Sequence, residues 1–473
     1  MVFLAALFLN KTKEAGSCSP GEEQKAFKPR IGIMAEKSIS WLIKLETEDG
    51  APPIRFGRYS DNNKPVEKVE KWNEAEGLFK EKAYHKSIAV FFDYLSDEWA
   101  QNVVHQQEGT SGTFYFYQGS KIIRGFYNDK VLEAQVALAE MPVPSVPVMR
   151  RLLELNFGLY YTCYALSGDK LCMKFDSDIE TANPSKLYYG LKELATKADK
   201  QDDLLVQDFT SLLTTDTEHI IPVPDTEKEV KYNHLQLWIK DTLDLIETVD
   251  PDKFSGGIAY MLLALAYRID FLLVPEGKLL LNIEKIVDIY FRKDDRPVSE
   301  KNQEMAEEFM KLQARSPEEI FPYLFRSRYT FSIVMPQVHK TIADAIYNAN
   351  QNISWYKENK HFRIASLIAE YGLAYCQYSY SLPRPVTEFF QLFMMVNYPE
   401  FFKALGFKAE YYDKEKGTFD QEAILAAIRQ IAEGWQGKYP DLKMREDKLR
   451  FDSLLAFNQS FTSEIEFLNL ETK

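Results

Sequence analysis

Cysteine is scarce in this sequence, and the cysteines that are present are scattered. The 473 residues contain four cysteines, and no two of them form a Cys-x-x-Cys pair. Closely spaced cysteines are typical of zinc sites and of redox-active pairs, so this spacing argues against both. Cys163 and Cys172 flank one predicted hairpin, but their offset in register argues against a disulfide. Scattered cysteines fit a reducing compartment, and we expect a cytoplasmic protein.

Motifs for catalysis or metal binding are also lacking. The six histidines are dispersed along the chain, and no group of them has the spacing of a metal site. His85 follows Glu81 by four residues, which predicts a pair on a helix surface. Gly256 and Gly257 form a lone glycine pair without the pattern of a phosphate-binding loop. We therefore expect no catalytic residue, no metal and no cofactor.

The chain has no basic stripe and no hydrophobic run of membrane-spanning length. Its net charge is −13 and the acidity is evenly spread, so nucleic acid and anionic membranes are poor partners. The most apolar run, residues 258–273, is shorter than the ~20 residues that cross a bilayer. It also contains Arg268 and Asp270. These features predict a buried central helix.

The first 33 residues have little structural pattern. Residues 2–9 are apolar, as in the hydrophobic part of a signal peptide, but no basic residue precedes them. Met34 begins a stretch with the features of an ordinary protein start. We expect residues 1–33 to be an unstructured or wrongly assigned extension. The alternative is a secreted or anchored protein, against which the cysteine usage weighs.

A well-patterned central stretch begins with three prolines in six residues. Pro142, Pro144 and Pro147 cannot lie inside a helix, so they mark a helix start, with Ser145 as the N-cap. The helix that follows carries an apolar stripe on one side. This stripe consists of Val148, Leu152, Leu155 and Leu159. It is either part of the core or the seam of a dimer.

The chain then changes from helical to strand periodicity. Residues 160–166 and 171–175 are predicted to form a hairpin, because the Gly-Asp pair between them suits a primed two-residue turn. This register places Leu166 opposite Leu171. A long final helix follows, with Asn183 just before its first turn.

A helical segment and three strands precede the central stretch. Residues 65–96 have helical periodicity, as one long helix or two short ones. Residues 113–117, 121–127 and 131–139 are predicted strands separated by short turns. The first of these strands is a continuous aromatic run, so we expect both of its faces to be covered.

The predicted order over residues 65–215 is α-β-β-β-α-β-β-α. This order resembles the type III secretion chaperone-like fold, which CesT-type chaperones and YbjN-like proteins share. The resemblance is carried by residues 147–158, 164–171 and 187–195. It implies a protein-binding domain, typically a homodimer, that holds partner segments on apolar patches or exposed sheet edges. An open sheet of five strands has two edges whose unpaired backbone groups accept an added strand.

The sequence divides into an α+β part and a helical part. We expect an α+β domain over residues 34–220, a linker over residues 221–231 and an α-helical domain over residues 232–473. The linker contains two prolines and a charge cluster and has no periodicity. Beyond it, apolar residues recur at helical spacing. The predicted fold class is therefore α+β with an antiparallel sheet, followed by an all-α domain.

Two features of the helical part bear on an alternative function, an enzyme or a ligand-binding regulator. Tyr371, Tyr375 and Tyr378 form an aromatic stripe, for which a packed helix face is favoured over a ligand site. The carboxylates within residues 304–308 and 318–319 are more simply a solvated helix face.

We predict a non-enzymatic protein-binding protein, either chaperone-like or an adaptor. Its partner is an unidentified protein, and a homodimer is expected, with neither nucleic acid nor membrane as a partner. The predicted dimer or partner surface consists of Val148, Leu152, Leu155, Phe114 and Phe116.

Overall fold

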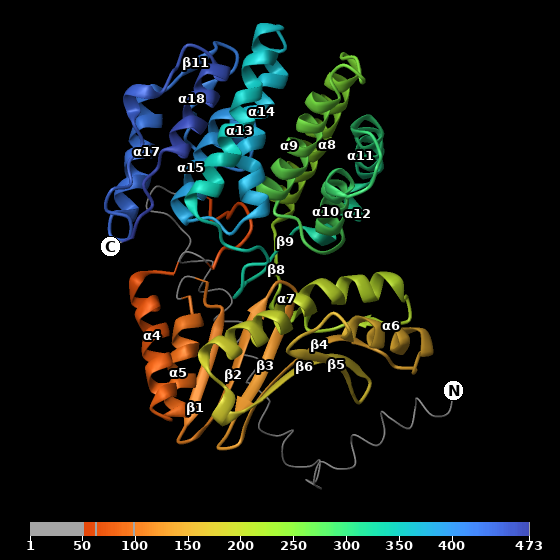
Figure 1. The fold of residues 1–473 in the computed structure, drawn as a ribbon. Helices are drawn as coiled ribbons and strands as arrows, with labels where there is room; N and C mark the ends of the chain where they lie inside the picture. The colour runs from red at the N-terminus through yellow and green to blue at the C-terminus, as the bar shows by residue number, and fades with distance from the viewer. Residues whose placement is uncertain (1–51, 62–63, 98–99, 473) are drawn as a thin grey trace. The chain divides into compact units, whose positions relative to one another are not determined.

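The computed structural model describes residues 52–61, 64–97 and 100–472. The predicted extension over residues 1–33 lies outside these ranges. Two helices, a sheet and two further helices make up the N-terminal half (Figure 1). Their bounds are α4 Val66–Lys80, α5 Tyr84–Leu95, β1 Val103–Glu108, β2 Ser111–Gln118, β3 Lys121–Tyr127, β4 Val131–Glu140, α6 Val146–Asn156, β5 Thr162–Ser167, β6 Lys170–Asp178, the 3-10 turn η1 Ile179–Thr181 and α7 Pro184–Asp208.

The sheet is antiparallel, with the strand order β1-β2-β3-β4-β6-β5, and the short strand β7 (Leu213–Thr214) also pairs with β4. The predicted antiparallel α+β half is therefore confirmed, with two strands more than expected, β1 and the two-residue β7. Strand β1 has the sequence Val-Val-His-Gln-Gln-Glu, whose polar end has little strand signal. Its pairing with β2 is what makes it a strand.

The hairpin predicted from the central stretch is confirmed in register. Leu166 pairs with Leu171, and Gly168 has a φ of 64°, which only glycine adopts at little cost. The Asn183 side chain accepts a hydrogen bond from the backbone N–H of Lys186 and so caps α7. These features are determined by turn and cap chemistry within a few residues.

The core of the N-terminal half lies between the sheet and the helices α4, α5 and α7. The side chains of Phe114 and Phe116 on β2 are buried there, against α5 and against Phe331. Helix α7 crosses the sheet closely, because a Cβ atom at Gly190 would lie 2.3 Å from the Phe175 ring. The opposite face of β2 carries Tyr117, which is also buried.

The C-terminal half is built mainly of helices, as predicted. The bounds of its main helices are α8 Asp225–Glu247, α9 Ser255–Leu273, α10 Gly277–Phe291, α11 Val298–Gln313, α12 Pro317–Ile320, α13 His339–Glu358, α14 Phe362–Ser379, α15 Arg384–Asn397, α16 Pro399–Ala404, α17 Gln421–Trp435 and α18 Leu454–Glu466. Four very short strands accompany them: β8 Ile221–Pro222 pairs with β9 Phe325–Arg326, and β10 Tyr412–Asp413 pairs with β11 Thr418–Phe419.

Helix α9 is the central helix of this half. Among the described residues it alone is long and apolar enough to cross a membrane, and 89% of its most apolar window is buried within the protein. A core helix meets the same criterion of length and composition. Its two charged residues are both paired, Arg268 with Glu370 and Asp270 with Arg58.

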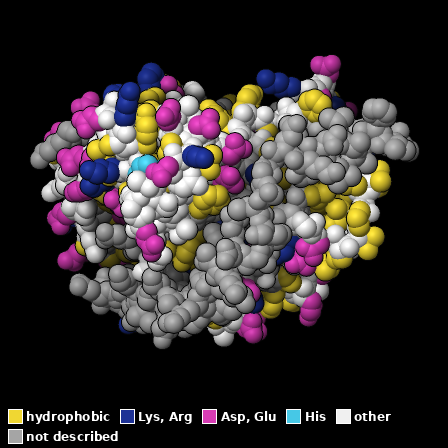
Figure 2. Space-filling view, turned by 90° about the horizontal axis from the view of Figure 1, so that it is seen from below, with side chains coloured by type: hydrophobic (Ala, Val, Ile, Leu, Met, Phe, Trp, Pro, Cys, Tyr) yellow, Lys and Arg dark blue, Asp and Glu magenta, His cyan; other side chains and the backbone are white. Residues whose placement is uncertain are grey.

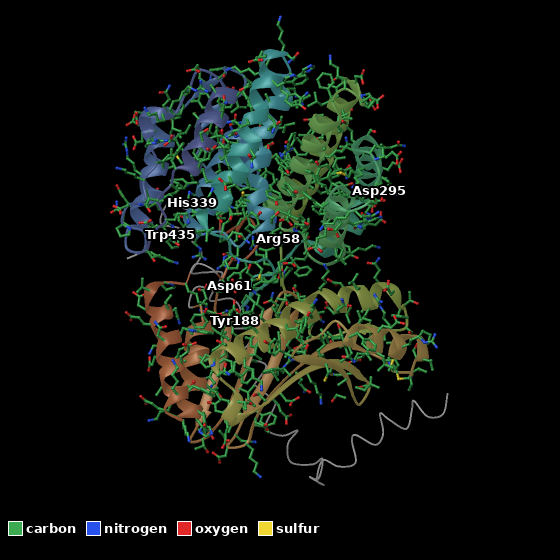
Figure 3. All side chains as sticks on the ribbon, viewed as in Figure 1. Arg58, Asp61, Tyr188, Asp295, His339 and Trp435 are labelled. Carbon is green, nitrogen blue, oxygen red and sulfur yellow. The ribbon has the colours of Figure 1, made fainter. Side chains whose placement is uncertain are left out.

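Two segments that are distant in sequence tie the halves together within the compact unit Leu45–Lys473. Residues 54–61 place Phe56 in the core of the helical half and the Asp61 carboxylate against the hydroxyl of Tyr188 on α7, at 2.8 Å (Figure 3). Conversely, residues 326–331 belong to the helical half and place Phe331 in the core of the sheet half. Helix α8 begins at Asp225, inside the segment expected to be a linker.

Candidate functional site

Four of the five side chains of the predicted partner surface are buried within the chain. Val148, Leu152, Phe114 and Phe116 all belong to the core of the sheet half, and Leu155 packs against that core while half-buried. A partner would have to open the core to reach the four buried side chains. The surfaces open to a partner are therefore the edges of the sheet and the exposed loops.

Strand β1 is an open edge of the sheet. A two-residue turn makes Glu108 and Ser111 a hydrogen-bonded pair. The Tyr117 amide also donates to the Asn102 carbonyl at 3.0 Å. By this alternation, the N–H and C=O groups of Val103, His105 and Gln107 point away from β2. None of these three amides has a hydrogen-bond partner in the part of the chain that the structure describes.

Side chains of β1 attach the open edge to the core of the sheet half. The Val103 side chain packs against the core, and the imidazole of His105 lies 5.0 Å from the Phe92 ring, centroid to centroid. The His105 Nε2 is 2.9 Å from the hydroxyl of Tyr127. Burial lowers the pKa of His105, so its ring is neutral at physiological pH. These contacts hold the first half of β1 against the core, while residues 106–108 are exposed.

The opposite edge, β5, is blocked by side chains. Its outward-pointing amides belong to Thr162, Tyr164 and Leu166, by the same alternation. The Thr162 amide donates to the Glu193 carboxylate at 3.0 Å, and the Tyr164 amide donates to the Asn156 side chain at 2.8 Å. Two of the three donors that an added strand needs are therefore already used.

Glu193 also holds the loop that leads into β5. Its carboxylate accepts hydrogen bonds from the amides of Tyr160 at 2.9 Å and Tyr161 at 2.7 Å, and from the Thr162 hydroxyl at 3.0 Å. Phe157 and Tyr160 in this loop are 94% and 92% exposed. Figure 2 shows hydrophobic side chains gathered at the side of the molecule that carries α6 and β5 in Figure 1.

A polar junction joins the sheet half to the helical half. The Lys121 ammonium lies 2.7 Å from the Asp202 carboxylate, and both side chains are buried. Asp199 accepts a hydrogen bond from the backbone N–H of Ser120 at 2.8 Å. Burial raises the pKa of Asp199 well above its usual value, and the neighbouring carboxylate of Asp202 adds to this effect.

Glu276, in the loop before α10, completes this junction. Its carboxylate accepts hydrogen bonds from the hydroxyls of Tyr329, at 2.7 Å, and Ser327. Burial raises the pKa of Glu276 to about 7. Burial likewise raises the pKa of Asp203 on α7 to about 7. No group of carboxylate, histidine and cysteine side chains within the described ranges has the arrangement of a metal site.

Segment 326–331 is anchored to the sheet by several contacts. The Arg328 guanidinium lies 3.5 Å from the centroid of the Tyr117 ring, and the Arg328 carbonyl accepts from the Gly119 amide at 3.0 Å. The Gln118 side chain accepts from the Phe331 amide at 3.0 Å and donates to its carbonyl at 3.2 Å. These contacts and the buried carboxylates hold the helical half against the sheet half, so the junction has a structural role.

The carboxylates and tyrosines considered for an enzyme site have ordinary structural partners. Glu304 lies in an ion pair with Arg296, and Glu308 pairs with lysines on α10 and α11. Glu319 and Ser316 form a capping box at the start of α12. The three tyrosines of the α14 stripe pack around Tyr267, with the Tyr378 ring 4.8 Å from it.

Sequence reasoning predicted open sheet edges, but it missed strand β1, which forms one of them, and the exposed aromatic loop. The turn residue Gly109 was the only local sign of the β1–β2 hairpin. Phe157 and Tyr160 are apolar residues next to a predicted core stripe, so the sequence pattern does not distinguish them from core residues. No family model matches this chain, and no curated protein is significantly similar to it in sequence.

Proposed function

We propose that this chain is a non-enzymatic protein-binding protein, chaperone-like or an adaptor, that holds an extended partner segment along strand β1. The observation that carries the proposal is the row of outward amides at Val103, His105 and Gln107, none of which has a partner among the described residues. An extended segment placed beside β1 gains main-chain hydrogen bonds without any rearrangement of the sheet. The resemblance to type III secretion chaperone-like domains supports the same mode of binding.

The side chains of β1 support this proposal. Edge strands that must stay unpaired usually carry lysine, proline or a bulge, and the six residues of β1 contain neither lysine nor proline. The other edge is protected, because Glu193 and Asn156 occupy its amides. A chain that protects one edge and leaves the other unprotected is suited to strand addition at a single position.

A second copy of the chain is one partner for this edge, which would give the homodimer expected from the resemblance. The scattered cysteines support a cytoplasmic location for either complex. The alternative function, a ligand site in the helical half, has no comparable geometry in its favour.

The test compares Gln107→Pro with Gln107→Ala in the full-length protein. Proline at this position removes only an outward N–H and is tolerated on an edge strand, whereas alanine keeps the N–H. Tagged protein is used to recover partners from native lysate, beside size-exclusion chromatography with light scattering. We expect the wild type and the alanine variant to bind a partner or to dimerise, and the proline variant to lose that complex. Equal complex formation by both variants would refute strand addition at β1.

A further inference from the structure

Two aromatic side chains in the loop between α6 and β5 stand almost entirely in solvent. Phe157 is 94% exposed and Tyr160 is 92% exposed. Single exposed apolar residues are normal, but each aromatic ring presents about 150–250 Å² of surface when accessible. Tyr161, beside them, is also exposed. Three exposed aromatic side chains within five residues make this loop a candidate interaction site.

The loop is preorganised for binding. Phe157 is the C-cap of α6 and keeps helical backbone angles, so the helix determines its position. Tyr160 follows three residues later, and its amide is one of the three that donate to the Glu193 carboxylate. Binding through this loop therefore costs little backbone ordering, which is the main entropic penalty for a flexible loop.

The mode of contact at this loop differs from that at β1. Glu193 and Asn156 occupy the outward amides of Thr162 and Tyr164, so an added strand cannot pair with this edge. The available contacts are the projecting rings of Phe157 and Tyr160. Projecting aromatic anchors require a concave apolar surface on the other molecule, because only a pocket removes both sides of a ring from water.

The charges near the loop indicate the rim of that pocket. Arg150 and Arg151 are exposed on α6, and Arg151 lies 3.8 Å from the Glu154 carboxylate in an ion pair within the helix. Arg150, Glu154 and Phe157 lie on one side of α6 by helical spacing. Arg150 has no ion-pair partner among the described residues, and its guanidinium favours an acidic group on the rim. The net charge of −13 on the chain as a whole opposes approach to an anionic membrane.

We propose that Phe157 and Tyr160 are paired anchors that insert into an apolar, acid-rimmed pocket on the surface of a folded partner protein. This inference rests on the proposed protein-binding function but concerns a different edge of the sheet and a different mode of contact. Failure of strand addition at β1 therefore leaves it standing.

The first experiment places the photo-crosslinking residue p-benzoylphenylalanine at position 160 of the full-length protein in cells. The same residue at position 467 is the matched control, because Phe467 is also exposed, at 63%, and lies at the other end of the chain. Mass spectrometry then maps the crosslinked residues. We expect crosslinks from position 160, but not from position 467, to an apolar surface bordered by aspartate or glutamate on a folded domain. Crosslinks to lipid, to a second copy of this chain or to no molecule would each overturn the proposal.

The second experiment measures the affinity of the purified crosslinked partner. Loss of two aromatic anchors should weaken binding by roughly 30-fold or more in the double variant Phe157→Ser with Tyr160→Ser. Phe467→Ser should leave the affinity unchanged, and thermal melts should show that all variants fold. Reversing the charge at Arg150, which has no ion-pair partner among the described residues, should slow association at low salt.

An affinity that is unchanged in the double serine variant would overturn the proposal. Gln107→Pro, measured beside it, separates the two sites. If only the proline variant loses binding, strand addition at β1 is supported and the proposal of aromatic anchors is contradicted. If only the double serine variant loses binding, the anchors are supported and strand addition at β1 is contradicted.

Discussion

The guanidinium of Arg58 and the carboxylate of Asp270 form a buried ion pair across 212 positions of the chain, with Nη2 2.7 Å from Oδ1 (Figure 3 labels Arg58). The Nε atom of Arg58 also donates to the same carboxylate at 3.0 Å. The guanidinium lies 4.2 Å from the centroid of the Tyr378 ring. This pair explains how an acidic residue is accommodated in the most apolar helix of the protein.

Breaking the Arg58–Asp270 pair should destabilise the protein strongly. Arg58→Met leaves the buried Asp270 carboxylate without its partner, which costs about 3–5 kcal/mol for pairs of this kind. The double variant Arg58→Met with Asp270→Leu removes both charges and should recover most of that loss. Urea denaturation of the wild type, both single variants and the double variant measures the coupling. Additive effects of the two single substitutions would contradict a direct interaction.

Removing the Phe331 side chain should destabilise the sheet half, although Phe331 lies more than 200 positions after Phe116, which it contacts. Phe331 is fully buried against Phe116 and Tyr188, and loss of a buried phenylalanine costs about 3–5 kcal/mol. We therefore expect Phe331→Ala to lower the free energy of unfolding by that amount. Hydrogen exchange should also show faster exchange of amides in β2 and α7. The control Phe467→Ala removes an exposed ring and should have little effect on either measurement. Unchanged exchange in β2 would contradict the contact.

Alanine at position 119 should destabilise the protein for two reasons, which a second glycine can separate. Its φ of 53° is unfavourable for alanine by about 1–2 kcal/mol, and a Cβ atom would lie 2.0 Å from the Asp199 carboxylate. Gly109 has a similar φ of 62°, but nothing lies within 4 Å of its Cβ position. We expect Gly119→Ala to lower the melting temperature clearly more than Gly109→Ala. Equal decreases would show that Asp199 does not restrict this position.

The stability of the protein should depend on pH through Glu276. Its pKa is about 7 in the folded chain, raised by burial, and about 4.3 in an unfolded chain. The folded state therefore binds more protons at Glu276 between these values, so the contribution of this group to stability is greatest below pH 4.3 and is lost as the pH rises through 7. This one group accounts for a decline of up to about 4 kcal/mol.

Glu276→Gln should remove that part of the pH dependence. Urea denaturation at several values between pH 5 and pH 8 should give a flatter stability curve for the variant than for the wild type. The control is Glu307→Gln, which changes an exposed carboxylate on α11 and should leave the wild-type curve unaltered. Parallel curves for Glu276→Gln and the wild type would contradict a titration of Glu276 in this range.

The local features of this fold were predictable from sequence. The hairpin register at Leu166 and Leu171 followed from a Gly-Asp turn, and the start of α7 followed from Asn183. The division into a sheet half and a helical half followed from a change of apolar period from two to 3.6. The burial of α9 followed from its length and its two charged residues. Each of these signals acts within about one turn or one hairpin.

The candidate sites could not be predicted in this way. Strand β1 has a weak pattern of its own and exists because β2 pairs with it. The blocked state of β5 depends on Glu193, which lies 31 positions after Thr162 in the chain. Phe157 and Leu152 belong to one apolar segment, yet one is 94% exposed and the other is buried. Periodicity alone does not separate the two.

The sequence by itself determined the types of element, their order, the turns and the helix caps, because backbone preferences and side-chain periodicity act between neighbouring residues. Only the tertiary structure decided which sheet edge stays open, which aromatic rings face solvent, and how the two halves are joined. Those outcomes depend on partners such as Asp270 for Arg58 and Phe116 for Phe331, more than 200 positions apart. Such contacts form only when the chain has folded, so no local pattern records them.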